Sequence, residues 1–229
     1  MNILAMDTST LTATVAVLTD EKLLGEFSVS NRLTHSQTIM PMTDTLLKTA
    51  SLTLNDIDVF AVSVGPGSFT GLRIGMATVK TFAQALDKPV IGISSLDAVA
   101  HSFSSADTVI CPIMDARRSE VYNALYKNGT EITAARALPI DELLGELEGE
   151  RVIFAGDGVL VHKDKLVQTP GWSMAPPHLL LPKASAVAYA ALKRAEDGDF
   201  DDLYNLNPVY LRKSQAERER EERLNKKEL

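Results

Sequence analysis

The predicted secondary structure of this chain repeats one layout twice, and the repeat restricts the folds that the chain can adopt. Apolar and β-branched runs predict three strands, a helix and a fourth strand at residues 3–7, 12–18, 22–30, 35–50 and 58–64. The same β-β-β-α-β order recurs at residues 108–115, 120–126, 131–138, 140–147 and 151–155. Strands that meander and then alternate with helices predict an α/β protein. We therefore expect two lobes, each a mixed sheet covered by helices, with a cleft between them.

Other segments complete the predicted organisation. Helices are expected at 68–86, 95–103 and 184–197, and short strands at 90–93 and 209–211. The proline-rich segment 170–182 predicts a loop, and Pro41 predicts a kink in the first helix or a late start to it. We place the first lobe at 1–106, joined by the closing segment 205–212, and a smaller second lobe at 107–204. Residues 213–229 are expected to form a charged, flexible tail.

Charge and cysteine content exclude several functions. The 229 residues carry a net charge of −7, and residues 213–229 hold six basic and five acidic side chains, so the remainder carries −8. Such an acidic body binds a nucleic-acid backbone poorly by itself. The single cysteine, Cys111, excludes a disulfide framework, and the four histidines lack metal-ligand spacing. No apolar run is long enough to cross a membrane, and no basic segment precedes the first strand, so we expect a cytoplasmic protein.

The stretch from Gly65 to Gly75 joins a strand to a helix through a tight glycine turn. Its sequence is Gly-Pro-Gly-Ser-Phe-Thr-Gly-Leu-Arg-Ile-Gly. Gly65, Gly67 and Ser68 would present backbone N–H groups at a helix N-terminus, a geometry that suits an anion. A well-capped strand-to-helix turn explains the same residues. No Gly-Lys-Ser/Thr sequence follows, so the segment is not a P-loop.

The helix that begins in this stretch carries an apolar stripe at three- and four-residue steps: Phe69, Leu72, Met76, Val79, Ala83 and Leu86. Gly71 and Gly75 lie on a neighbouring line and would let another helix approach closely, although a glycine costs about 1 kcal/mol inside a helix. Two explanations are open. The stripe packs in the core of its own lobe, or it joins the first helix in an interface with another chain.

Acidic turns occupy equivalent places in the two halves. Asp7, Thr8 and Ser9 end the first strand, and Asp115 ends the first strand of the second half. In a two-lobed fold both turns face the cleft, where an acid and hydroxyl groups would hold a metal–phosphate group. An Asx turn that caps a hairpin explains the first turn equally well. Gly156-Asp157-Gly158 is a third turn with access to the cleft.

Four segments, in the same order, resemble the TsaB (YeaZ) family over nearly the whole chain. They are residues 1–10, the Gly65–Gly75 stretch, Asp-Ala-Arg-Arg-Ser-Glu-Val-Tyr at 115–122 and Pro-Val-Tyr-Leu-Arg at 208–212. The resemblance implies the duplicated, RNase H-like α/β fold of actin, sugar kinases and Hsp70. It also implies a role in making threonylcarbamoyladenosine on tRNA. There the homologous TsaD subunit transfers the threonylcarbamoyl group, and TsaE is an ATPase that joins the complex.

By this resemblance the chain is a non-catalytic partner or scaffold of TsaD. The alignment places Ser95 and Val99 where TsaD has two metal-binding histidines, and neither side chain replaces an imidazole. We therefore expect no catalytic residue, no metal and no cofactor of its own, with ATP or ADP present only in the complex. tRNA would be bound only through the complex. A vestigial nucleotide or phosphate cleft would be lined by Asp7, Thr8, Ser9, Gly65, Gly67, Ser68 and Asp115.

The family's interface is a bundle of the first two helices, which implies that TsaD, or a second copy of this chain, contacts both helices. The residues expected there are His35, Ile39, Met42, Leu46, Phe69, Leu72, Arg73, Met76, Val79 and Lys80. A second hypothesis is an ATP-dependent small-molecule phosphotransferase of the same fold, with Asp7 and Asp115 in the cleft. A third, a metal-dependent peptidase, lacks a ligand cluster in the sequence.

Overall fold

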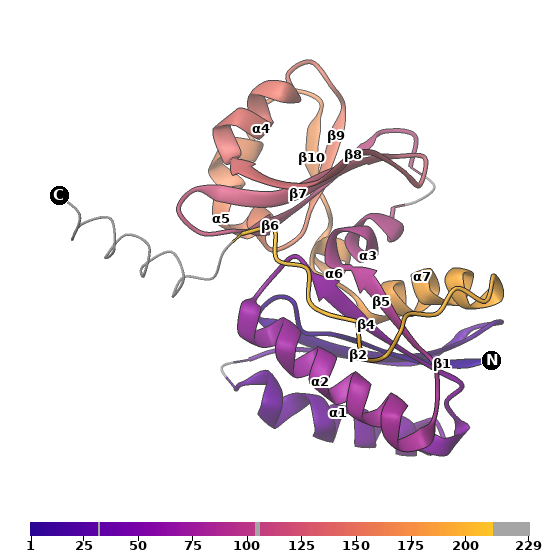
Figure 1. Cartoon of the computed structure of the whole chain (residues 1–229). Coiled ribbons are helices and arrows are strands. Elements are labelled where there is room, and N and C mark those ends of the chain that lie inside the picture. Colours follow the sequence, from indigo (N-terminus) through magenta and orange to yellow (C-terminus); the bar gives the residue numbers. More distant parts are fainter. Residues whose placement is uncertain (32, 104–105, 213–229) are drawn as a thin grey trace.

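The computed structural model describes residues 1–31, 33–103 and 106–212, which form two lobes, each built on a five-stranded sheet (Figure 1). The first sheet has the order β3-β2-β1-β4-β5. β1 pairs antiparallel with β2 and parallel with β4, and β4 pairs parallel with β5. Its strands are β1 Asn2–Asp7, β2 Thr12–Thr19, β3 Leu23–Ser30, β4 Val59–Gly65 and β5 Val90–Ser94.

The second sheet repeats this plan. Its order is β10-β9-β6-β7-β8, so an antiparallel meander again continues into parallel strands. The strands are β6 Val109–Asp115, β7 Glu120–Lys127, β8 Thr130–Pro139, β9 Val152–Ala155 and β10 Trp172–Met174. The predicted duplication of the β-β-β-α-β layout is therefore confirmed.

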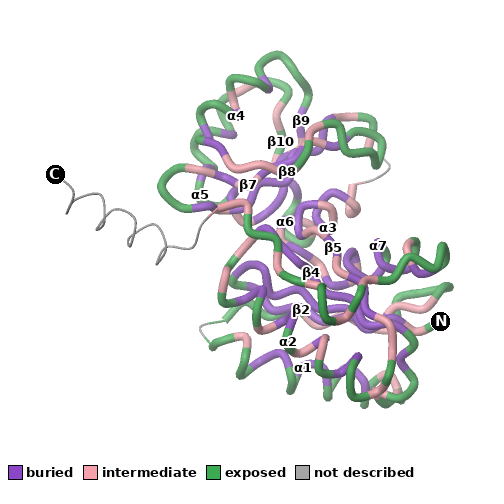
Figure 2. Tube along the Cα trace, in the orientation of Figure 1, coloured by how far each residue is buried: buried purple, intermediate pink, exposed green. Residues whose placement is uncertain are grey.

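Helices cover both faces of the first sheet, and the residues of its strands alternate between two cores. Leu4 and Met6 face a core shared with α1 (His35–Thr49) and α2 (Phe69–Leu86). Ile3 and Ala5 face the opposite core, which is shared with the alanine-rich α7 (Ala184–Glu196). This alternation is what the pleat of a strand imposes. Figure 2 shows the buried strands between helices whose outer sides are exposed.

The remaining helices cover the second lobe and the junction between the lobes. α3 (Ser95–His101) contacts α7 and β4 of the first lobe as well as β6 of the second. α4 (Ile140–Glu146), α5 (Gly158–Leu166) and α6 (Pro177–Leu180) contribute to the core of the second lobe. A short 3-10 helix, η1 (Leu54–Asp56), precedes β4. None of the helices in the described ranges is both long and apolar enough to cross a membrane.

Helix α7 returns the chain to the first lobe, although its residues belong to 107–204, the range assigned to the second lobe from the sequence. It contacts β1, β2, β4 and β5. Glu26 of β3 holds its N-terminus, because the Glu26 carboxylate accepts hydrogen bonds from the N–H and the hydroxyl of Ser185, at 2.9 and 3.0 Å. A carboxylate at a helix N-terminus is stabilising, since the N–H groups there lack helical partners.

Several local predictions were wrong. Segment 170–182 is not all loop, because it contains β10 and α6, and α5 was not predicted. Residues 209–211 form no strand, although the Val209 N–H donates one hydrogen bond to the Val64 carbonyl. α1 begins at His35 and continues through Pro41. The predicted tail at 213–229 lies outside the described residues.

Candidate functional site

The glycine-rich start of α2 packs directly on the turn between β1 and β2. A Cβ atom added to Gly71 would lie 2.0 Å from the Thr8 carbonyl oxygen, and one added to Gly75 would lie 2.4 Å from Thr8 Oγ1. The Thr8 hydroxyl donates to the Gly71 carbonyl at 2.8 Å, and the Ser68 N–H donates to the Ser9 carbonyl at 2.7 Å. The space beside the two glycines is therefore filled by the protein's own turn between β1 and β2, and not by the helix of another chain.

Asp7 is enclosed by this packing. Its side chain is fully buried and accepts hydrogen bonds from Ser63 and from the hydroxyl and N–H of Ser9. Burial raises the pKa of Asp7 above its usual range, while these hydrogen bonds oppose the rise. Of the two explanations for this turn, the Asx turn agrees with the structure, because the Asp7 carboxylate accepts from the Ser9 N–H two residues later. Asp7 is not available to a ligand in the cleft.

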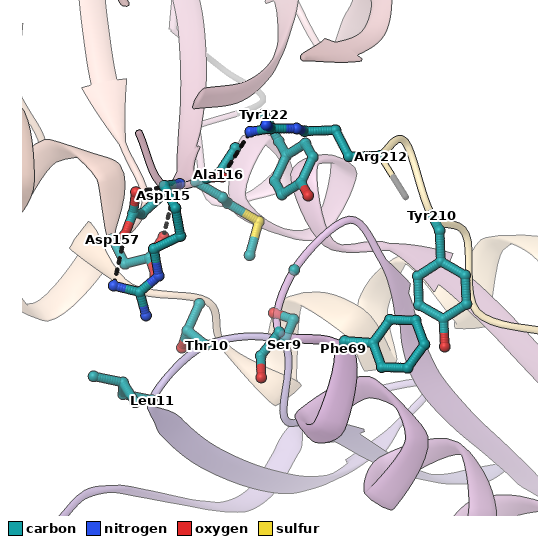
Figure 3. A pocket seen from close by; sticks show the side chains of 14 residues that line it. Ser9, Thr10, Leu11, Phe69, Asp115, Ala116, Tyr122, Asp157, Tyr210 and Arg212 are labelled. Carbon is teal, nitrogen blue, oxygen red and sulfur yellow. Dashed lines mark hydrogen bonds and ion pairs between the residues drawn. The ribbon is translucent and has the colours of Figure 1, made fainter. Parts of the chain in front are cut away.

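An interlobe pocket of about 270 Å³ lies above this turn (Figure 3). We define the interlobe pocket by its lining, which comes from both lobes and from the C-terminal segment: Ser9, Thr10, Leu11, Gly67, Ser68, Phe69, Met114, Asp115, Ala116, Arg117, Tyr122, Asp157, Tyr210 and Arg212. Of the predicted cleft residues, Ser9, Gly67, Ser68 and Asp115 line it. Asp7, Thr8 and Gly65 do not.

Two acids from the second lobe meet at the roof of the pocket. The Asp115 N–H donates to Asp157 Oδ1 at 3.2 Å, and the Asp115 carboxylate forms an ion pair with Arg117, also at 3.2 Å. Burial raises the pKa of Asp157 to about 6, and the negative charge of Asp115 adds to the rise. Asp157 lies in the Gly156-Asp157-Gly158 turn, which was expected to have access to the cleft, and it lines the pocket.

The lining of the interlobe pocket is largely polar and charged. Hydroxyl groups, two carboxyl groups and two guanidinium groups surround it, and no histidine, lysine or cysteine is among its lining residues. Within the described ranges, no group of three or more His, Cys, Asp or Glu side chains could hold a metal ion. Cys111 is buried in β6, and this burial raises the pKa of its thiol, so it is a poor nucleophile. Phe69, Tyr210 and Arg212 were not predicted as parts of a pocket.

The apolar residues predicted for a partner interface pack inside the first lobe. Leu72, Val79, Ile39, Leu46, Met76 and Met42 have exposed fractions between 0 and 9%. The buried part of the apolar stripe of α2 therefore packs in the core of its own lobe, where it covers the first sheet. Arg73 remains exposed, and His35, Phe69 and Lys80 are partly exposed. The His35 ring lies 2.8 Å from the Thr10 carbonyl oxygen through Nε2.

The outer sides of α1 and α2 form a paired-helix face, which we define by the exposed residues Met40, Thr70, Ala77 and Thr81. At 100° per residue, the three α2 residues point away from buried Leu72. Beside this face, a groove of about 310 Å³ separates α1 from η1 and the end of α2. Its apolar lining is Met40, Leu47, Leu52, Leu54 and Phe82.

Comparisons with known proteins agree with this architecture. A family model for TsaD, a tRNA N6-adenosine threonylcarbamoyltransferase, matches residues 29–218. The tRNA threonylcarbamoyladenosine biosynthesis protein TsaB of Bacillus subtilis is 34% identical over 227 residues, which cover 95% of this chain and 96% of that protein. The structure of YeaZ from Pseudomonas aeruginosa has a TM-score of 0.79 at 29% identity, covering 92% of this chain and 99% of that chain.

A more distant structure shows only the fold. The activator of 2-hydroxyisocaproyl-CoA dehydratase from Clostridium difficile has a TM-score of 0.55 at 13% identity, and the match covers 86% of this chain and 97% of that chain. The architecture is the duplicated actin-like ATPase and sugar kinase fold, as predicted. With a relative of 34% identity along almost its whole length, the chain belongs to the TsaB (YeaZ) family.

Proposed function

We propose that this chain acts in tRNA threonylcarbamoyladenosine biosynthesis as a non-catalytic partner subunit of the TsaD transferase. The match of the TsaD family model to residues 29–218 carries the proposal, because a chain that shares the transferase's fold is suited to pair with it. Ser95 and Val99, which replace the two histidines of TsaD in our alignment, are 0% and 2% exposed. A buried hydroxyl and a buried isopropyl group do not replace two imidazole ligands of a metal.

The paired-helix face is the surface that we assign to TsaD. The α2 ridge of Thr70, Ala77 and Thr81 is made of small side chains, which let the backbone of a facing helix come close. Met40 of α1 is 47% exposed and lines the groove with Phe82 of α2, where it offers a flexible apolar contact. Because TsaD shares the fold, its own first two helices would meet this face about a pseudo-twofold axis. A second copy of this chain would use the same face when TsaD is absent.

Cofactors and further partners follow from this role. We infer that the chain brings no cofactor of its own, and that ATP or ADP enters only in the complex with TsaD and the ATPase TsaE. tRNA contacts the complex mainly through the other subunits, because residues 1–212 carry a net charge of −8. The alternative, a small-molecule phosphotransferase, requires Asp7 in the cleft, and the burial of Asp7 weighs against it.

The test is a charge placed on the paired-helix face. Ala77→Glu puts a carboxylate on the exposed ridge of α2, and Ala134→Glu makes the same change on the exposed surface of β8 in the second lobe. Each variant is mixed with TsaD, the molar mass is measured by light scattering, and threonylcarbamoylation of tRNA is assayed with TsaD and TsaE. We expect the wild type and Ala134→Glu to form a heterodimer that supports activity, and Ala77→Glu to lose both. A folded Ala77→Glu variant with full binding would refute the assigned face, and absence of any wild-type complex would refute the role itself.

A further inference from the structure

The segment after α7 runs along the first lobe before it reaches the second (Figure 1). It starts at Asp201, which forms a bridge with Val90 of β5. Lys80 of α2 then donates to the Leu206 carbonyl at 3.0 Å, and the Val209 N–H donates to the Val64 carbonyl at 2.7 Å. A Cβ atom at Gly65 would lie 2.6 Å from the Val209 carbonyl oxygen, so the segment passes close to the end of β4. These contacts fix residues 206–209 on the first lobe.

Tyr210 strengthens this attachment through α2. Its ring stacks on Phe69, with centroids 4.4 Å apart and an interplanar angle of 24°. The Arg73 guanidinium lies 3.9 Å from the centre of the Phe69 ring, and Arg73 Nε donates to the Tyr210 hydroxyl at 3.0 Å. Stacked rings and a cation over a ring face are mutually favourable. Arg73 and Lys80 are therefore engaged by this segment.

Arg212 carries the segment across to the second lobe. Its guanidinium donates to the Ala116 carbonyl at 2.8 Å and forms an ion pair with Glu120, and its side chain is only 16% exposed. Figure 3 shows Arg212 reaching from the C-terminal segment to Ala116 at the edge of the interlobe pocket. Ala116 follows the end of β6 and Glu120 begins β7, so the two contacts flank the turn between these strands.

That turn has an unfavourable backbone. Arg117, Arg118 and Ser119 have φ angles of 66°, 56° and 59°, so three successive residues with side chains are left-handed. Such residues persist where surrounding contacts hold them. The Asp115 carboxylate accepts from the Arg117 N–H at 2.8 Å, and Arg212 holds the turn from outside at Ala116 and Glu120. The charge-assisted contacts of the partly buried Arg212 guanidinium with Ala116 and Glu120 therefore hold this turn, and with it the second lobe, against the C-terminal segment.

We propose that residues 206–212 are a latch that fastens the second lobe to the first and so sets the opening of the interlobe pocket. Its base is the attachment to β4 and α2, and its catch is Arg212 on the β6–β7 turn. Tyr210 and Arg212 are also walls of the pocket, so releasing the catch removes one side of the pocket and frees the roof formed by Asp115 and Ala116. The latch acts within this chain, and its test needs neither TsaD nor tRNA.

The test measures the distance between the lobes in the full-length chain. Cysteines replace Gln84, exposed on α2, and Ala134, exposed on β8, and both carry spin labels. Cys111 is fully buried and stays unlabelled. Pulsed double electron–electron resonance is recorded for the otherwise unchanged chain, for Arg212→Gln, and for Arg151→Gln, which removes an exposed arginine of the second lobe that has no contact with the latch.

We expect a single narrow distance distribution for the unchanged chain and for Arg151→Gln. Arg212→Gln should add a population at longer distance while its thermal unfolding stays cooperative. A distribution identical to that of the unchanged chain would overturn the proposal. If Arg212→Gln does not fold, Tyr210→Ala answers the same question, because Tyr210 is 40% exposed and its loss weakens the base of the latch. An unchanged distribution in that variant would overturn the proposal equally.

Discussion

Replacing Gly71 by alanine tests how closely α2 approaches the turn between β1 and β2. The new Cβ would lie 2.0 Å from the Thr8 carbonyl oxygen, whereas ordinary contacts begin at 3.4 Å. Because the obstacle is backbone, α2 or the turn would have to move. Overpacking costs about 1–3 kcal/mol. Loss of the Thr8 hydrogen bond costs about 1 kcal/mol, and the better helix propensity of alanine returns up to about 1 kcal/mol. The free energy of unfolding should therefore fall by about 1–3 kcal/mol.

Gly145 supplies the matched control. It lies exposed in α4, and a Cβ added there meets nothing within 4 Å. Gly145→Ala should therefore raise stability by up to about 1 kcal/mol. In a thermal melt followed by circular dichroism, 1 kcal/mol corresponds to about 2–4 °C for a chain of this size. We expect Gly71→Ala to lower Tm by about 2–12 °C and Gly145→Ala to raise it slightly. Equal or increased stability of Gly71→Ala would refute the packing argument.

Two further predictions concern buried groups. The pKa of Asp157 is about 6 in the folded chain and near 3.8 in the unfolded chain. Between these pH values the folded state binds one proton more than the unfolded state. The free energy of unfolding therefore falls as the pH rises through this range, by roughly 3 kcal/mol. In urea titrations, the free energy of unfolding of Asp157→Asn relative to the wild type should rise by that amount from pH 4 to pH 8. A difference between the two proteins that does not depend on pH would contradict the raised pKa of Asp157. Met76→Asp places a carboxylate in a core site that is 5% exposed, so it should destabilise the chain by about 3–5 kcal/mol. A wild-type urea midpoint for that variant would show that Met76 is not in the core.

The repeat and the long amphipathic helices could be predicted because their signals are periodic. α1 and α2 were found within two residues of their bounds, since each carries buried residues at three- and four-residue steps. α5 was missed because it has apolar residues, Leu160 and Val161, on its exposed side and departs from helical geometry at His162. β10 was missed because three residues among prolines give no alternation to detect. In each case tertiary contacts decided the structure where the local signal was weak.

The candidate site was only partly visible in the sequence. Two residues expected at the cleft line the pocket: Asp115, which ends β6, and Ser68, which is the N-cap of α2. The burial of Asp7 could not be foreseen, because it depends on how closely α2 packs against the first turn. The apolar stripe of α2 identified a buried side, but a stripe alone does not tell whether the protein's own sheet or another chain covers it. Tyr210 and Arg212 reach the pocket through a segment without regular structure.

The path of the chain between the lobes has a mechanical consequence. The chain crosses from the first lobe to the second once between α3 and β6, and returns once between α6 and α7. Two covalent links alone would leave one rotational freedom, about the line through them, and the packing of α3 against β6 and β7 restricts that rotation. The contact of Arg212 with Ala116 and Glu120 restrains the second lobe at a further place. Because this contact is a hydrogen bond and an ion pair, its loss should widen the range of rotation while both covalent links stay intact.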